Sequence, residues 1–125
     1  MKCLSNQSKA SILDWYWSKG LHDAKIINKR ISFFPDYYET SRGFYNCIEI
    51  NVDSSNALFD RSIVSLKFYN CKEKDPELNI EGMYWVNDTV LEQWGRYTLK
   101  IEFFSSDRKK HLYEISFEKC IVVRQ

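Results

Sequence analysis

Apolar and polar residues alternate with a period of two along most of the chain after Gly20. This alternation is typical of strands in an antiparallel sheet that buries one face and exposes the other to solvent. The segments with the pattern are 24–34, 44–52, 64–69, 97–103 and 113–123. With a further strand over 78–86, the pattern predicts a sheet of about six strands.

One segment near the N-terminus has helical spacing instead. Its apolar residues fall on one helical stripe, and they are Ile12, Leu13, Tyr16 and Trp17. Gly20 suits the position just after a helix end, so we expect a helix over 9–19. The capping-box spacing of Thr89 and Glu92 predicts a second, single helical turn over 89–94 that ends at Gly95.

These elements predict an α+β fold that is mainly β. The N-terminal helix packs on or beside a mostly antiparallel sheet, and the 125 residues form a single domain, 1–125. Long apolar runs, which mark a buried parallel sheet, do not occur in the sequence.

Charge and composition exclude several classes of partner. Eighteen Lys and Arg against 17 Asp and Glu give a net charge of +1, which offers nucleic acid or an anionic membrane no attraction. No apolar run approaches the roughly 20 residues that span a bilayer. The polar start of the chain lacks a secretory apolar segment, and the four cysteines are widely spaced, so we expect a cytoplasmic protein with free thiols.

His22, one of two histidines, is adjacent to Asp23, and the pair is a candidate for catalytic or metal-binding chemistry. They could act as a base with its orienting carboxylate, or as metal ligands. The alternative is that they hold the helix-to-strand junction by bonding backbone groups. We favour the junction role and expect no metal and no cofactor.

No other arrangement in the sequence indicates an enzyme. There is no nucleophile elbow, zinc-binding helix motif or glycine-rich phosphate loop. Glu102 and Glu114 lie on the polar side of their strands. They could form a catalytic carboxylate pair, or each could form an ordinary cross-strand ion pair. We expect the ion pairs, and a protein that is not an enzyme.

The chain has more aromatic residues than a core of this size needs, with eight Tyr, eight Phe and four Trp. Tyr and Trp are favoured at protein interfaces because they bury a large area at low entropic cost. The interface candidates are Trp15, Trp17, Tyr84, Trp85 and Trp94, with Glu102 and Glu114 as charged neighbours.

Three stretches resemble a known family. A Trp-rich N-terminal segment leads into Leu-His-Asp-Ala-Lys-Ile at 21–26, followed by Gly-Met-Tyr-Trp-Val at 82–86 and Ile-Ser-Phe-Glu-Lys-Cys-Ile-Val-Val at 115–123. This layout resembles small bacterial immunity proteins of polymorphic toxin systems and related uncharacterised single-domain proteins. The resemblance implies an α+β protein that neutralises a cognate toxin by direct binding, without catalysis.

The first functional hypothesis is therefore a non-enzymatic immunity protein whose partner is a toxin. Two alternatives stay open. One is a small-molecule-binding domain or enzyme with a pocket near His22 and Asp23. The other is a structural subunit that forms a homodimer through a sheet edge or an aromatic patch.

Overall fold

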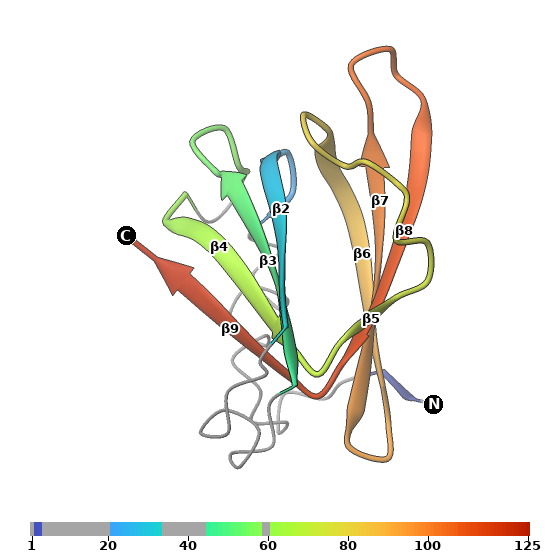
Figure 1. The fold of residues 1–125 in the computed structure, drawn as a ribbon. Coiled ribbons are helices and arrows are strands. Elements are labelled where there is room, and N and C mark those ends of the chain that lie inside the picture. Colours follow the sequence, from blue (N-terminus) through green and yellow to red (C-terminus); the bar gives the residue numbers. More distant parts are fainter. Residues whose placement is uncertain (1, 4–20, 34–44, 59–60) are drawn as a thin grey trace.

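The computed structural model describes residues 2–3, 21–33, 45–58 and 61–125, which form one nine-stranded antiparallel sheet (Figure 1). The strands are β1 (Lys2–Cys3), β2 (Lys25–Phe33), β3 (Asn46–Asp53), β4 (Ile63–Tyr69), β5 (Lys72–Glu73), β6 (Tyr84–Gln93), β7 (Arg96–Phe104), β8 (Lys110–Phe117) and β9 (Lys119–Arg124). Their order is β5-β8-β7-β6-β2-β3-β4-β9, and β1 pairs with β6.

The sheet is divided at the seam between β2 and β6. These strands meet in a single register pair, Lys25 with Tyr84, whereas β6 and β7 pair over nearly their whole length. Figure 1 shows the two groups diverging from each other. We call β2, β3, β4 and β9 the first half-sheet, and β5, β6, β7 and β8 the second half-sheet.

The core lies between the two half-sheets. Strand alternation points Ile50, Leu66 and Phe68 inward from the first half-sheet, and all are buried. Trp85 and Phe117 are buried on the inner side of the second half-sheet. Phe68 and Phe117 pack with ring centroids 4.8 Å apart, so the two inner faces form one hydrophobic cluster.

The expected α+β class is wrong for the described residues, which contain strands and turns but no helix. The predicted helix over 9–19 lies outside the described residues. The helical turn expected over 89–94 is instead the end of β6, up to Gln93, and the start of the turn after it, because Val90 is buried opposite Leu99 on the inner face. Burial on a strand outweighs the local capping pattern there.

The segment 113–123 was expected to be a single strand, and it is two. Phe117 is buried in the second half-sheet and Cys120 in the first, so the inward side changes between them. The chain crosses from one half-sheet to the other at Glu118, whose N–H donates to the Tyr69 carbonyl oxygen at 3.1 Å. Antiparallel pairing itself, as predicted from the alternation, is confirmed for every strand pair.

Candidate functional site

The His22–Asp23 pair lies where the chain enters β2, beside β6. The His22 Nδ1 N–H donates to the Val86 carbonyl oxygen, and the Asp23 backbone N–H donates to the Trp85 carbonyl oxygen at 2.7 Å. The Leu58 N–H donates to the His22 carbonyl oxygen at 2.9 Å. His22 Nε2 is 3.8 Å from Asp23 Oδ2. These bonds join the junction to β6 and to the β3–β4 connection.

Trp85, an interface candidate from the sequence, has no exposed surface. Its Nε1–H donates to Asp88 Oδ2 at 2.8 Å, and its ring lies edge-on to Phe103 at 5.6 Å. Trp85 is therefore a core residue and not a contact residue. Trp15 and Trp17 lie outside the described residues.

Trp94, in contrast, is 93% exposed. Together with Gly95 it forms the two-residue turn between β6 and β7, which Gln93 and Arg96 close as a register pair. Both turn residues have positive φ, 50° for Trp94 and 78° for Gly95. Such turns favour Asn, Asp or Gly at the first position, so a bulky indole there is unusual.

The base of this turn is held by a polar network at the crossing between half-sheets. Arg96 Nη2 donates to the Asn70 carbonyl oxygen at 2.9 Å, and Arg96 Nη1 lies 3.3 Å from Glu118 Oε1. Asn70 Nδ2 also donates to Glu118 Oε2 at 3.0 Å. The Trp94 turn is thus attached to both half-sheets.

The end of β2 and the start of β3 lie at the same end of the molecule as the β6–β7 turn (Figure 1), and each is next to or contains a further exposed aromatic residue. The Tyr45 N–H donates to Asn70 Oδ1 at 2.8 Å, and Phe33 is in register with Asn46. Phe33 is 73% exposed and Tyr45 62% exposed. Phe33, Tyr45 and Trp94 are the most exposed aromatic residues of the described chain, and we call them the aromatic end.

The other three interface candidates lie together on the outer face of the second half-sheet. Tyr84 is in register with Phe104, and both are partly exposed. Glu102 lies 3.4 Å from Lys110, and Glu114 lies 3.8 Å from Lys100, as closest charged atoms. Both glutamates therefore form cross-strand ion pairs.

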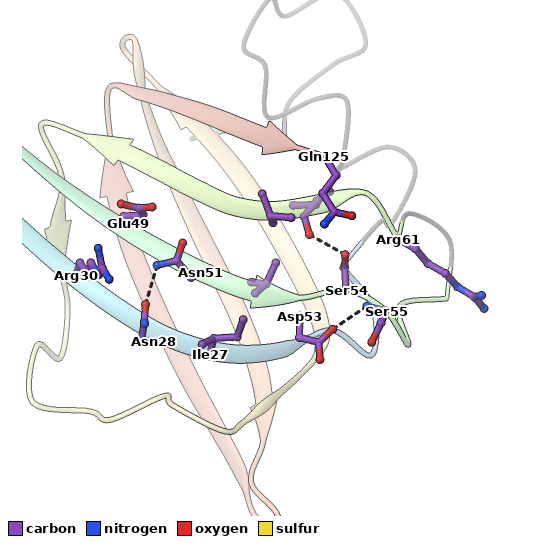
Figure 2. Close-up of a pocket in the computed structure, with 13 residues that line it drawn as sticks. Ile27, Asn28, Arg30, Glu49, Asn51, Asp53, Ser54, Ser55, Arg61 and Gln125 are labelled. Atoms are coloured by element: carbon purple, nitrogen blue, oxygen red, sulfur yellow. Dashed lines mark hydrogen bonds between the residues drawn. The ribbon is translucent and has the colours of Figure 1, made fainter.

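A groove of about 600 Å³ lies on the outer side of the first half-sheet, and Figure 2 shows it. Its polar lining residues include Asn28 and Arg30 of β2, Glu49 and Asn51 of β3, and Arg61. The Asn51 Nδ2 donates to Asn28 Oδ1 at 2.7 Å. The sequence analysis did not identify this groove. The only signal was that 24–34 carries apolar residues on both faces of the predicted strand, such as Ile26 and Ile27.

The described buried cysteines are poorly suited to nucleophilic chemistry. Cys47, Cys71 and Cys120 are buried thiols. Burial raises the pKa of the Cys47 thiol, and raises the pKa of the Cys71 thiol to about 11. Among the described residues there is also no cluster of three His, Cys, Asp or Glu side chains that could hold a metal ion.

Comparison with family models, curated proteins and solved structures finds no match of any of the three kinds. Within the part of the chain that the structure describes, no helix is long and apolar enough to cross a membrane.

Proposed function

We propose that this chain is a non-enzymatic protein-binding module whose main contact is the aromatic end. The single observation that supports this most is Trp94, 93% exposed and held at positive φ in a two-residue turn. A left-handed backbone costs a non-glycine residue roughly 1–2 kcal/mol. Strained positions of this kind concentrate at functional sites, and exposed Trp is the residue most enriched among binding hot spots.

The surroundings of Trp94 fit this role. Arg96, Asn70 and Glu118 fix the base of the turn, so little conformational entropy is lost when a partner surrounds the indole. Phe33 and Tyr45 add apolar area at the same end. A rigid aromatic centre with charged groups around it is the usual anatomy of a tight interface.

Within this class we propose an immunity protein that neutralises a cognate bacterial toxin by direct binding. The sequence resemblance at 21–26, 82–86 and 115–123 supports it, and so does the near-neutral net charge, which suits protein recognition better than nucleic-acid binding. The alternative of an active site at His22 has less support, because the His22 imidazole is engaged by the Val86 carbonyl oxygen. The homodimer alternative is decided by sedimentation of the purified protein.

The test uses Trp94→Asn with Leu112→Asn as the matched control. Leu112 is also exposed, at 68%, but it lies on the outer face of the second half-sheet. The wild-type chain is used to capture partners from its host, and any captured toxin is assayed for activity with and without the chain. We expect the wild type and Leu112→Asn to inhibit the toxin and Trp94→Asn to lose most of the inhibition.

Two results would contradict the proposal. If Trp94→Asn, shown to be folded by circular dichroism, inhibits as well as the wild type, the aromatic end is not the contact surface. If the chain sediments as a stable dimer that Trp94→Asn dissociates, the aromatic end serves self-association and not toxin binding.

A further inference from the structure

The groove on the first half-sheet is shaped by two β-bulges. The register of β2 with β3 shifts between Ile26 and Asn28, and the register of β4 with β9 shifts between Ile63 and Ser65. The inserted residues are Ile27 and Val64, and both line the groove. Bulges bend a strand and redirect its side chains, and they are enriched beside functional sites. Two of them on either side of β3 hollow a face that would otherwise be flat.

Each end of the groove has one positively and one negatively charged side chain. Figure 2 shows Arg30 and Glu49 toward one end, and Asp53 and Arg61 toward the other. Within the described residues no ion pair involves any of these four side chains. The groove is therefore rich in donors and acceptors, and the charges of these four side chains sum to zero.

Between the two ends lies a planar amide pair. The bond from Asn51 Nδ2 to Asn28 Oδ1 fixes both amides. It leaves the Asn28 NH₂ group and the Asn51 carbonyl oxygen with capacity for further hydrogen bonds. Because both residues stand on paired strands, these groups are held at fixed positions before any ligand arrives.

One buried hydroxyl beside the groove has no hydrogen-bond partner. Ser65 is 4% exposed, and its Oγ is the single unsatisfied buried side-chain polar atom found among the described residues. Leu66 and Phe68 belong to the core, so Ser65 belongs to the opposite face, where it is in register with Asn51. An unsatisfied buried polar group is costly, but Ser65 is not one of the residues that line the groove, so its hydroxyl is no direct contact for a ligand there.

From these observations we infer that the groove is a binding site for a neutral, polyhydroxylated ligand of the oligosaccharide class. Each hydroxyl of such a ligand both donates and accepts, which matches the mixture of guanidinium, carboxylate and amide groups. Ile27, 54% exposed on the groove side, offers apolar contact to the C–H face of a sugar ring. The volume of about 600 Å³ lies within the range of small-ligand sites.

The charge pattern of the groove disfavours anionic ligands and divalent cations. A phosphate or polyanion drawn to Arg30 would meet Glu49, the residue directly opposite it on β3. A divalent cation drawn to Glu49 would meet the guanidinium of Arg30 at the same end of the groove. A neutral ligand meets neither repulsion, and its hydroxyls can bridge Arg30 and Glu49.

The test is a titration of the uniformly ¹⁵N-labelled full chain followed by two-dimensional NMR. The probes are cellohexaose, maltohexaose and N-acetylchitohexaose, with hexagalacturonate as an anionic comparison. We expect saturable shifts with at least one neutral hexasaccharide, including the side-chain NH₂ signals of Asn28 and Asn51. Arg30→Ala and Asn51→Ala should each weaken the Kd at least about tenfold.

The matched control is Arg108→Gly, which removes an exposed arginine from the β7–β8 turn, a segment that does not line the groove. This variant and Trp94→Asn should bind the saccharide like the wild type. The inference is overturned if no neutral hexasaccharide produces saturable shifts, if only hexagalacturonate does, or if Arg30→Ala and Asn51→Ala bind unchanged while folded. None of these outcomes bears on the aromatic end.

Discussion

Trp94 occupies a backbone conformation that its own side chain disfavours. At φ 50° the Cβ approaches the following carbonyl oxygen, whereas Asn tolerates this conformation well. We expect Trp94→Asn to raise the free energy of unfolding by roughly 0.5–1 kcal/mol. Urea denaturation followed by circular dichroism measures this change.

The same variant is predicted to lose toxin inhibition, so stability and binding should move in opposite directions. Trp94→Phe is the matched control, because it keeps an aromatic ring and the same backbone strain. An unchanged or lower stability of Trp94→Asn would show that the indole makes a compensating contact in the folded chain.

A second residue-scale feature is a buried ion pair that connects the half-sheets. Lys29 Nζ of β2 lies 2.5 Å from Glu73 Oε2 of β5, and the Tyr113 hydroxyl of β8 donates to the same oxygen at 2.7 Å. The Glu73 side chain is 3% exposed and the Lys29 side chain 13% exposed. Lys29 Nζ also lies 5.8 Å from the centre of the Tyr113 ring.

Removing the carboxylate leaves a largely buried ammonium group without its counter-charge. We expect Glu73→Ala to cost about 3 kcal/mol of unfolding free energy. Tyr113→Phe removes one hydrogen bond and keeps the ring, so it should cost about 1–2 kcal/mol. Both are measured by urea denaturation. Equal costs for the two variants would mean that the charge of Lys29 is solvated and the ion pair contributes little.

At the scale of the element, the β7–β8 turn contains another non-glycine residue at positive φ. Arg108 has φ 63°, its N–H donates to the Ser105 carbonyl oxygen at 2.9 Å, and the Ser105 N–H donates to the Lys109 carbonyl oxygen at 3.0 Å. Its backbone geometry is therefore fixed by the turn, while its side chain is exposed.

Glycine adopts this conformation without steric cost, so we expect Arg108→Gly to stabilise the chain by about 0.5–1 kcal/mol. Arg108→Lys keeps the charge and the backbone strain, and it should leave the thermal midpoint unchanged. An equal gain of stability in Arg108→Lys would show that the loss of the guanidinium, and not the relief of backbone strain, causes the effect.

Several strands could be predicted from the sequence, whereas the extent of β6, the short strands β1 and β5 and the irregularities of the sheet could not. The alternation in 44–52, 64–69 and 97–103 reflects one buried face, and β3, β4 and β7 occupy these segments. The bulges at Ile27 and Val64 depend on the partner strand, so alternation within one strand does not reveal them. The crossing at Glu118 was missed because apolar residues continue on both sides of it.

At the scale of the whole molecule, both candidate sites are assembled from distant parts of the chain. The aromatic end joins residues 33, 45 and 94, and the groove joins β2, β3 and the β3–β4 connection. The sequence could nominate Trp94 by residue type. It could equally nominate Trp85, because burial depends on which face of β6 meets the other half-sheet.

The buried thiol of Cys71 makes the stability of the whole molecule depend on pH in the alkaline range. Burial raises the pKa of this thiol from 9.0 to about 11, because the thiolate is poorly solvated in the folded chain. Below pH 9 the thiol is protonated in both states, and its contribution to stability is fully present. As the pH rises from 9 to 11 only the unfolded chain loses the proton, so stability falls by up to about 3 kcal/mol.

Urea titrations at pH 7, 9, 10 and 11 should show this decline for the wild type and a smaller decline for Cys71→Ala, whatever the absolute stability of the variant. Parallel declines in the two proteins would move the effect to Cys47, whose pKa is raised by burial, or to Tyr113, whose pKa is raised by burial and by its hydrogen bond to Glu73. The stability profiles of Cys47→Ala and Tyr113→Phe would then show which of the two groups is responsible, because the variant that lacks that group has the flatter profile.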